Sequence, residues 1–135
     1  RSNPLRDGDG YYLVLVTALT GVIWIPYILN RIAVRGLIDA VGYPADPKPH
    51  APWAQRLIKA HTNAVENLVV FAPLVLAAEM AGATSGVTAG AAAIFFWARL
   101  VHAVSFAFAI PWVRTLAFAV GFFCQAAIAW VLLIG

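Results

Sequence analysis

Four long apolar stretches dominate this chain, and they restrict the folds that it can adopt. They run from about residues 11 to 29, 56 to 80, 87 to 110 and 112 to 133. Each is close to the roughly 20 residues that a helix needs to cross the hydrocarbon core of a bilayer. Only 11% of the residues are charged, whereas a soluble domain carries about 25%. The sequence therefore predicts an all-α integral membrane protein, a single four-transmembrane-helix bundle over residues 1–135.

The basic residues of the connecting segments predict an orientation. Residues 1–10 form a polar lead-in, and the first connection, residues 30–54, has a proline-rich second half that cannot form a regular helix. Five of the nine lysines and arginines lie in or beside this first connection, Arg114 follows the third, and the second has none. By the positive-inside rule, we expect the first and third connections to face the cytoplasm and both termini to lie outside.

The second apolar stretch opens with a stripe of polar side chains. At about 100° per residue, these side chains share roughly one third of the circumference of a helix. A polar stripe within a bilayer is costly unless it faces protein or water. We therefore expect this stripe to mark the functional site. Its members are Arg56, Lys59, Asn63, Glu66 and Asn67.

The third apolar stretch carries Arg99 and His102 well away from its ends. At 1.5 Å per residue, Glu66 and Arg99 lie roughly 15 and 18 Å from the predicted cytoplasmic ends of their helices. Adjacent antiparallel helices would bring these two charges to one level, and Asn63 would match His102 in the same way. An arginine inside a membrane needs a partner, and Glu66 is the partner that we expect.

These residues predict a cationic pocket between the helices, open to the cytoplasm. Guanidinium groups and amides suit a small anionic ligand. Simpler interpretations remain open: an ion pair between Glu66 and Arg99 that only fixes helix register, basic residues that anchor helix ends at the headgroups, and a buried histidine with a structural role. The expected pocket residues are Arg56, Lys59, Asn63, Arg99, His102 and Arg114.

The rest of the sequence argues against other classes of site. Cys124 is the only cysteine and lies in an apolar run, so we expect a buried, inert thiol and no metal cluster. No phosphate-binding glycine loop or serine-nucleophile motif is present. The basic residues sit at the ends of apolar runs, which argues against nucleic-acid binding. His61 points away from the polar stripe, and we assign it no ligand role.

The motifs together resemble those of the MAPEG superfamily, the membrane-associated proteins in eicosanoid and glutathione metabolism. The second stretch reads Arg56-x-x-Lys59-Ala-His61-x-Asn63-x-x-Glu66-Asn67, then Phe71, and the third reads Arg99-x-x-His102, with Arg114 beyond it. The four spans and the long first connection agree, so the resemblance covers nearly the whole chain. The motifs resemble those of a bacterial-type member of the superfamily, and this resemblance implies a location in the bacterial inner membrane. It also implies a homotrimer that binds glutathione between neighbouring subunits near the cytoplasmic side.

The resemblance implies roles for individual residues. Lys59 stands where the family commonly has an arginine that contacts glutathione. Arg114 is the nearest candidate for the catalytic arginine that holds the glutathione thiol as a thiolate. A free thiol has a pKa near 8.5, and an adjacent guanidinium lowers it. Asn63, Glu66, Arg99 and His102 match positions that line the glutathione site, and Arg56 joins them in the expected pocket.

Three functions follow as hypotheses. The first is a glutathione-dependent membrane transferase or peroxidase, to which a lipophilic electrophile comes from the bilayer. The second is a non-catalytic lipid-binding or scaffold subunit. Phe106 favours it, because enzymatic relatives often have a tyrosine there and phenylalanine has no hydroxyl. The third is an ion or proton pathway, which has the least support because only one carboxylate lies deep.

Overall fold

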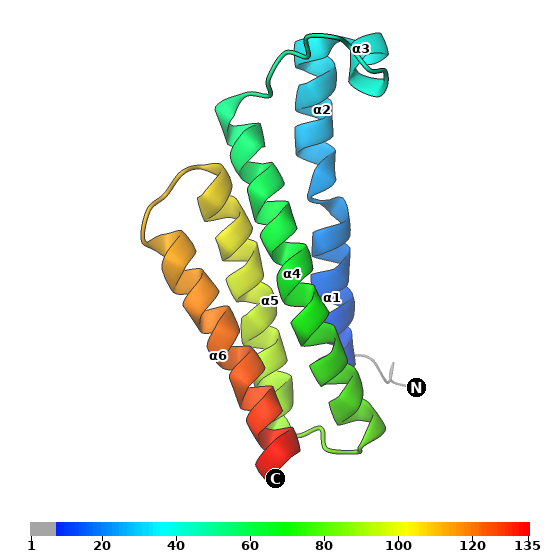
Figure 1. The fold of residues 1–135 in the computed structure, drawn as a ribbon. Helices are drawn as coiled ribbons and strands as arrows, with labels where there is room; N and C mark the ends of the chain where they lie inside the picture. Colours follow the sequence, from blue (N-terminus) through cyan, green and yellow to red (C-terminus); the bar gives the residue numbers. More distant parts are fainter. Residues whose placement is uncertain (1–7) are drawn as a thin grey trace.

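The computed structural model describes residues 8–135, and in this part of the chain every regular element is a helix (Figure 1). Four helical segments are long and apolar enough to cross a membrane: residues 9–35, 52–80, 86–107 and 113–134. The predicted all-α bundle with four transmembrane helices is therefore confirmed. The predicted polar lead-in falls largely outside the described residues. The helices are α1 (Asp9–Val22), α2 (Trp24–Arg35), α3 (Leu37–Val41), α4 (Pro52–Met80), α5 (Gly86–Ala107) and α6 (Val113–Ile134).

The first membrane span is built from two helices. α1 and α2 are separated at Ile23, three residues before Pro26. Proline has no amide hydrogen to donate to the carbonyl of Val22, and its ring crowds that turn, so the helix is interrupted there. It resumes at once and reaches Arg35, six residues beyond the predicted end of the span. Gly36, with a φ of 80°, ends α2 and turns the chain into the short helix α3.

The half of the bundle away from α3 packs around large apolar side chains. Phe71 of α4 and Phe95 of α5 stack with their ring centroids 4.0 Å apart. Val16, Val75 and Ile128 bring α1, α4 and α6 into the same buried cluster. α5 lies against α1, α4 and α6, and so forms the centre of this half.

The half nearer α3 packs Ile23 and Leu57 among several small side chains. Its buried cluster contains Ala60 and Ala64 of α4 and Ala103 and Ala107 of α5. Small residues allow the backbones of membrane helices to approach one another closely. The same half contains the polar residues of the site.

The turn between α5 and α6 sets the position of Arg114. α5 ends at Ala107, three residues earlier than predicted, and α6 begins at Val113. Within this turn Ala109 and Trp112 have φ values of 55° and 63°, in the left-handed region that residues other than glycine seldom adopt. Arg114 therefore lies in the first turn of α6, close to the end of α5.

Candidate functional site

The centre of the candidate site is Arg99, which is 3% exposed inside the bundle. Its Nη2 atom donates a 2.6 Å hydrogen bond to Oδ1 of Asn63 and lies 3.4 Å from Nδ1 of His102. Its Nε and Nη1 atoms are buried and have no hydrogen-bond partner in the described part of the chain. Arg99 is therefore a buried cation, and two of its nitrogen atoms donate no hydrogen bond within the described part of the chain.

The expected ion pair between Glu66 and Arg99 is not formed in the described part of the chain. Glu66 is exposed, and the acceptors around Arg99 are the Asn63 amide and the His102 ring. The position of α4 along α5 explains the difference. Nε of Arg56 in α4 donates a 3.0 Å hydrogen bond to the carbonyl of Ala107 in α5. This bond sets Arg56 level with the end of α5, which comes earlier than predicted. At 1.5 Å per residue, Arg99 then lies roughly 12 Å inward, level with Asn63.

Hydrogen bonds hold the polar stripe of α4 against α6 as well. The side-chain amide of Asn67 donates to the backbone carbonyl of Asn63 at 2.9 Å, within α4. The side-chain amide of Gln125 in α6 donates to the backbone carbonyl of Asn67 at 3.1 Å. Gln125 is buried, and the sequence analysis missed it. The signal was present, since Gln125 is the one amide side chain in the apolar run of α6.

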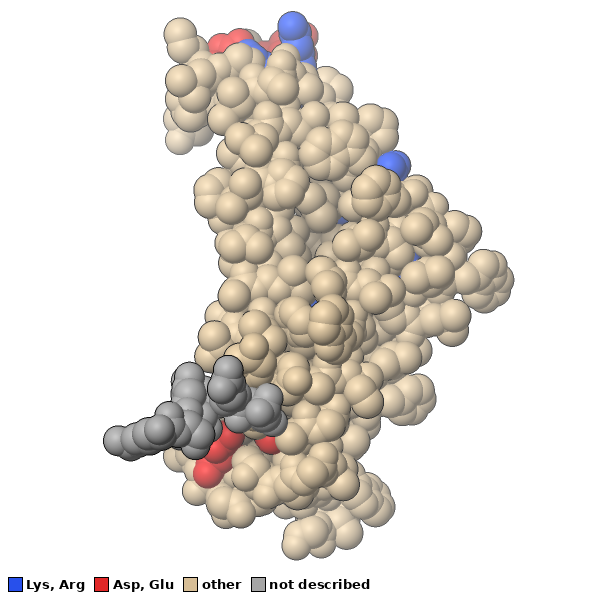
Figure 2. Space-filling model, turned by 180° about the vertical axis from the view of Figure 1, so that it is seen from behind, with Lys and Arg blue, Asp and Glu red and all other residues tan. Residues whose placement is uncertain are grey.

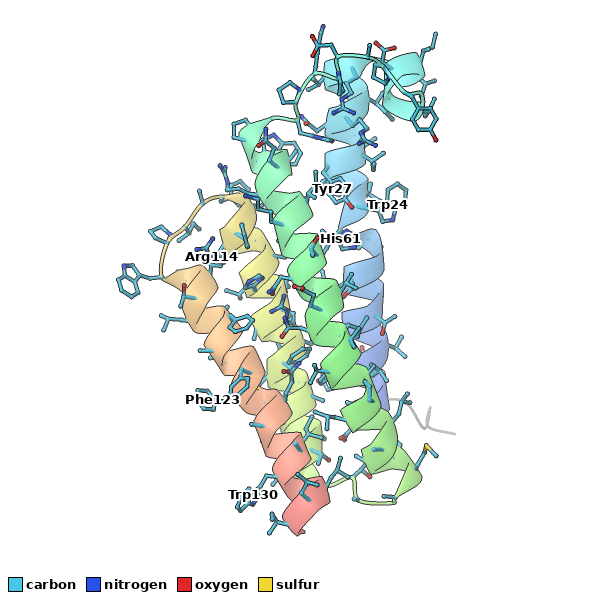
Figure 3. The ribbon with its side chains drawn as sticks, viewed as in Figure 1. Trp24, Tyr27, His61, Arg114, Phe123 and Trp130 are labelled. Atoms are coloured by element: carbon cyan, nitrogen blue, oxygen red, sulfur yellow. The ribbon has the colours of Figure 1, made fainter. Side chains whose placement is uncertain are left out.

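Arg114 and His102 meet at the side chain of Phe106. The guanidinium carbon of Arg114 lies 4.6 Å from the centroid of the Phe106 ring, in cation–π geometry. The ring of His102 packs edge-on against the same phenylalanine, at 5.7 Å between centroids. Figure 3 shows Arg114 at the start of α6, beside the turn from α5. A hollow of about 180 Å³ lies there, lined by Arg56, Ser105, Phe106, Ala109, Ile110, Pro111 and Arg114.

The structure brings together five of the seven predicted site residues. Contacts run from Asn63 through Arg99 and His102 to Phe106 and so to Arg114, and Arg56 shares the hollow with Arg114. The side chains of the other two, Lys59 and Glu66, are exposed on α4.

Two residues outside this group also have defined surroundings. His61 points to another side of α4, where its Nδ1 atom lies 2.8 Å from the hydroxyl of Tyr27 in α2 (Figure 3). The predicted burial of Cys124 is confirmed.

The fold and the site define a membrane-spanning helical protein with a buried cluster of an arginine, an amide and a histidine between its helices. The sequence model of the MAPEG family matches residues 13–134, nearly the whole chain, so the protein belongs to the MAPEG family. Comparisons with curated proteins and with solved structures gave no match. The chain is thus an integral membrane protein of the superfamily that acts in eicosanoid and glutathione metabolism.

Proposed function

We propose that this protein is a glutathione-dependent membrane transferase or peroxidase that acts on lipophilic electrophiles. The observation that carries the proposal is the state of Arg99, whose charge is buried and whose Nε and Nη1 atoms have no partner in the described part of the chain. A buried charge is costly unless it is paired and hydrogen-bonded. Glutathione has two carboxylates, and one of them against Arg99 would provide the missing acceptors.

Arg114 is suited to hold the glutathione sulfur as a thiolate. Its guanidinium lies at the hollow beside Phe106, and a nearby cation lowers the pKa of a thiol. In the transferase reaction the thiolate sulfur would bond to an electrophilic carbon, and the leaving group would depart with its bonding electron pair. Because Phe106 has no hydroxyl, Arg114 would provide this stabilisation without help from that position.

The exposed face of α4 beside the site supports a homotrimer as part of the proposal. Lys59 and Glu66 are exposed on α4, and Val65 and Val69 beside them are exposed as well. A neighbouring copy would cover this surface and could complete the glutathione site with Lys59 and Glu66. The orientation that we propose follows the basic residues: first and third connections in the cytoplasm, both termini outside, in a bacterial inner membrane.

Calorimetry with glutathione on the detergent-purified oligomer tests this proposal. We expect saturable binding to the wild type, weakened roughly 10- to 100-fold in Arg99→Ala, since a hydrogen bond to a charged group contributes about 1.5–3 kcal/mol. We also expect the thiolate ultraviolet absorbance of bound glutathione to be lost in Arg114→Ala. Lys48→Ala removes a positive charge from the first connection and is the matched control. Absence of binding to the wild type at several millimolar glutathione would contradict the proposal.

A second candidate is a non-catalytic lipid-binding or scaffold subunit. Two observations favour it: the phenylalanine at position 106, and an apolar groove of about 350 Å³ beside the break in the first span. Glutathione binding without turnover of any lipophilic electrophile would support this candidate. In that case, the gain of turnover in Phe106→Tyr would show that the missing hydroxyl is the reason. The groove is lined by Leu19, Val22, Ile23, Pro26, Trp53, Leu57, Leu100, Ala103, Val104, Ala107 and Phe108.

A further inference from the structure

The first connection exposes a set of large apolar side chains. Leu37, Ile38 and Val41 of α3 are 63–83% exposed, and Tyr43 just beyond them is fully exposed. Figure 1 shows α3 at the end of α2, on the side away from α4, α5 and α6. No other helix of the described chain covers these side chains, although they lie next to a membrane span.

The same connection gathers positive charge. The Nε atom of Arg35 donates to the carbonyl of Lys48 at 2.7 Å, and Oδ1 of Asn30 accepts a bond from the amide of Ala51 at 3.0 Å. These two bonds fold the proline-rich segment back against α2. They bring His50 near the cations of α2, and its pKa is lowered by its partial burial and by the charges of Arg31 and Arg35.

Some nitrogen atoms of this cluster are unsatisfied. Nε of Arg31 and Nε2 of His50 are buried, and neither has a hydrogen-bond partner among residues 8–135. Asp39 and Asp46 belong to the same connection, yet no carboxylate of the described residues forms an ion pair with the cations of this cluster. The cluster thus carries guanidinium groups that form no ion pair within the described part of the chain, which suits a phosphate group.

We propose that the first connection docks onto anionic phospholipids of the leaflet beside it. Leu37, Ile38 and Val41 would enter the interfacial layer, and Arg31, Arg35 and Lys48 would bind headgroup phosphates. Apolar side chains next to basic ones are the composition of segments that lie in a membrane interface, and clusters of lysine and arginine beside a span attract anionic lipids. Figure 2 shows both basic and acidic side chains at this end of the molecule, and mostly uncharged surface over the middle of the same face. This inference does not depend on the proposed glutathione chemistry.

Spin labels on the connection test the apolar contact. In a Cys124→Ser background, Ile38→Cys would carry the label, and Ala45→Cys, at an exposed site of the same connection, is the matched control. In nanodiscs that contain phosphatidylglycerol, we expect oxygen to collide with the label at residue 38 and a water-soluble nickel chelate to be excluded, with the reverse at residue 45. Free access of the chelate to residue 38 would overturn the proposal. So would exclusion of both reagents, because it would mean that a protein chain covers α3.

A titration of the detergent-solubilised protein tests the contribution of charge. Dioctanoyl phosphatidylglycerol should bind saturably and raise the pKa of His50, measured by NMR, because a nearby anion favours the protonated ring. The double variant Arg31→Gln/Arg35→Gln should weaken this binding about twentyfold, since each basic residue near an anionic surface contributes a factor of about five. Arg31→Lys/Arg35→Lys keeps the charge and should bind within about twofold of the wild type.

Two further ligands separate a lipid from other sources of the same response. An equal response to dioctanoyl phosphatidylcholine would overturn the requirement for negative charge. An equal response to inorganic phosphate at the same concentration would overturn docking to lipid in favour of a site for free anions. We expect neither ligand to match phosphatidylglycerol.

Discussion

The two halves of the bundle are packed by different means. The half away from α3 interlocks large side chains around the stacked rings of Phe71 and Phe95. The half near α3 lines its helices with alanine and places the buried Arg99 and His102 among them. In a bilayer, packing and hydrogen bonds hold helices together, because lipid chains are as apolar as the protein core. From this difference we expect the aromatic half to provide more of the stability, while the small side chains of the other half leave room for polar groups to meet.

Phe95→Ala is the strongest test of this division. Removal of a fully buried phenylalanine leaves a cavity, and we expect the free energy of unfolding to fall by about 3–5 kcal/mol. Phe122→Ala is the control, because Phe122 is 54% exposed on α6. Reversible denaturation in detergent measures both. Equal losses in the two variants would mean that the aromatic half has no special part in stability.

Substitutions at Arg99 and Asn63 address the other half. Arg99→Met replaces a buried charge by an apolar chain of similar length, and we expect the unfolding free energy to stay the same or to rise while glutathione binding is lost. Asn63→Leu keeps the charge and removes its acceptor, so we expect a loss of about 1.5–3 kcal/mol. The same denaturation experiment compares them. A large loss of stability in Arg99→Met would show that this arginine has a structural role instead of a binding role.

The smallest expected effect concerns the contact between α2 and α4. Tyr27→Phe removes the hydroxyl that lies 2.8 Å from His61, and interhelical hydrogen bonds in membranes contribute about 0.6 kcal/mol on average. We expect a stability change of that size and unchanged glutathione affinity. Tyr11→Phe, on the exposed ring at the start of α1, is the control. A change in glutathione affinity in Tyr27→Phe alone would extend the candidate site to this face of α4.

The fold could be predicted because length and apolar content decide whether a helix crosses a bilayer. The helix ends were less accurate. Pro26 interrupts the first span without ending it, so the span continues to Arg35. α5 stops at Ala107 because the chain enters a turn with left-handed residues, which no residue type at those positions indicates.

The sequence indicated which polar side chains would lie close together better than it indicated which contacts they would form. Helical periodicity placed Arg56 and Asn63 on one face of α4. Arg99 was expected to lie near them because a charge inside a membrane needs a polar partner. The predicted partner of Arg99 was wrong because the depth of Arg99 in the membrane was counted from a predicted end of α5 that differs from the observed end at Ala107. The contact between Tyr27 and His61 could not be predicted, because it depends on how α2 packs against α4.

The break at Ile23 has a mechanical consequence. α1 packs against both α4 and α5, whereas α2 packs mainly against α4 and α3. The two parts of the first span therefore have different neighbours. A pull on the first connection at the membrane surface would reach the bundle through α2 and α4, the helix that carries Asn63.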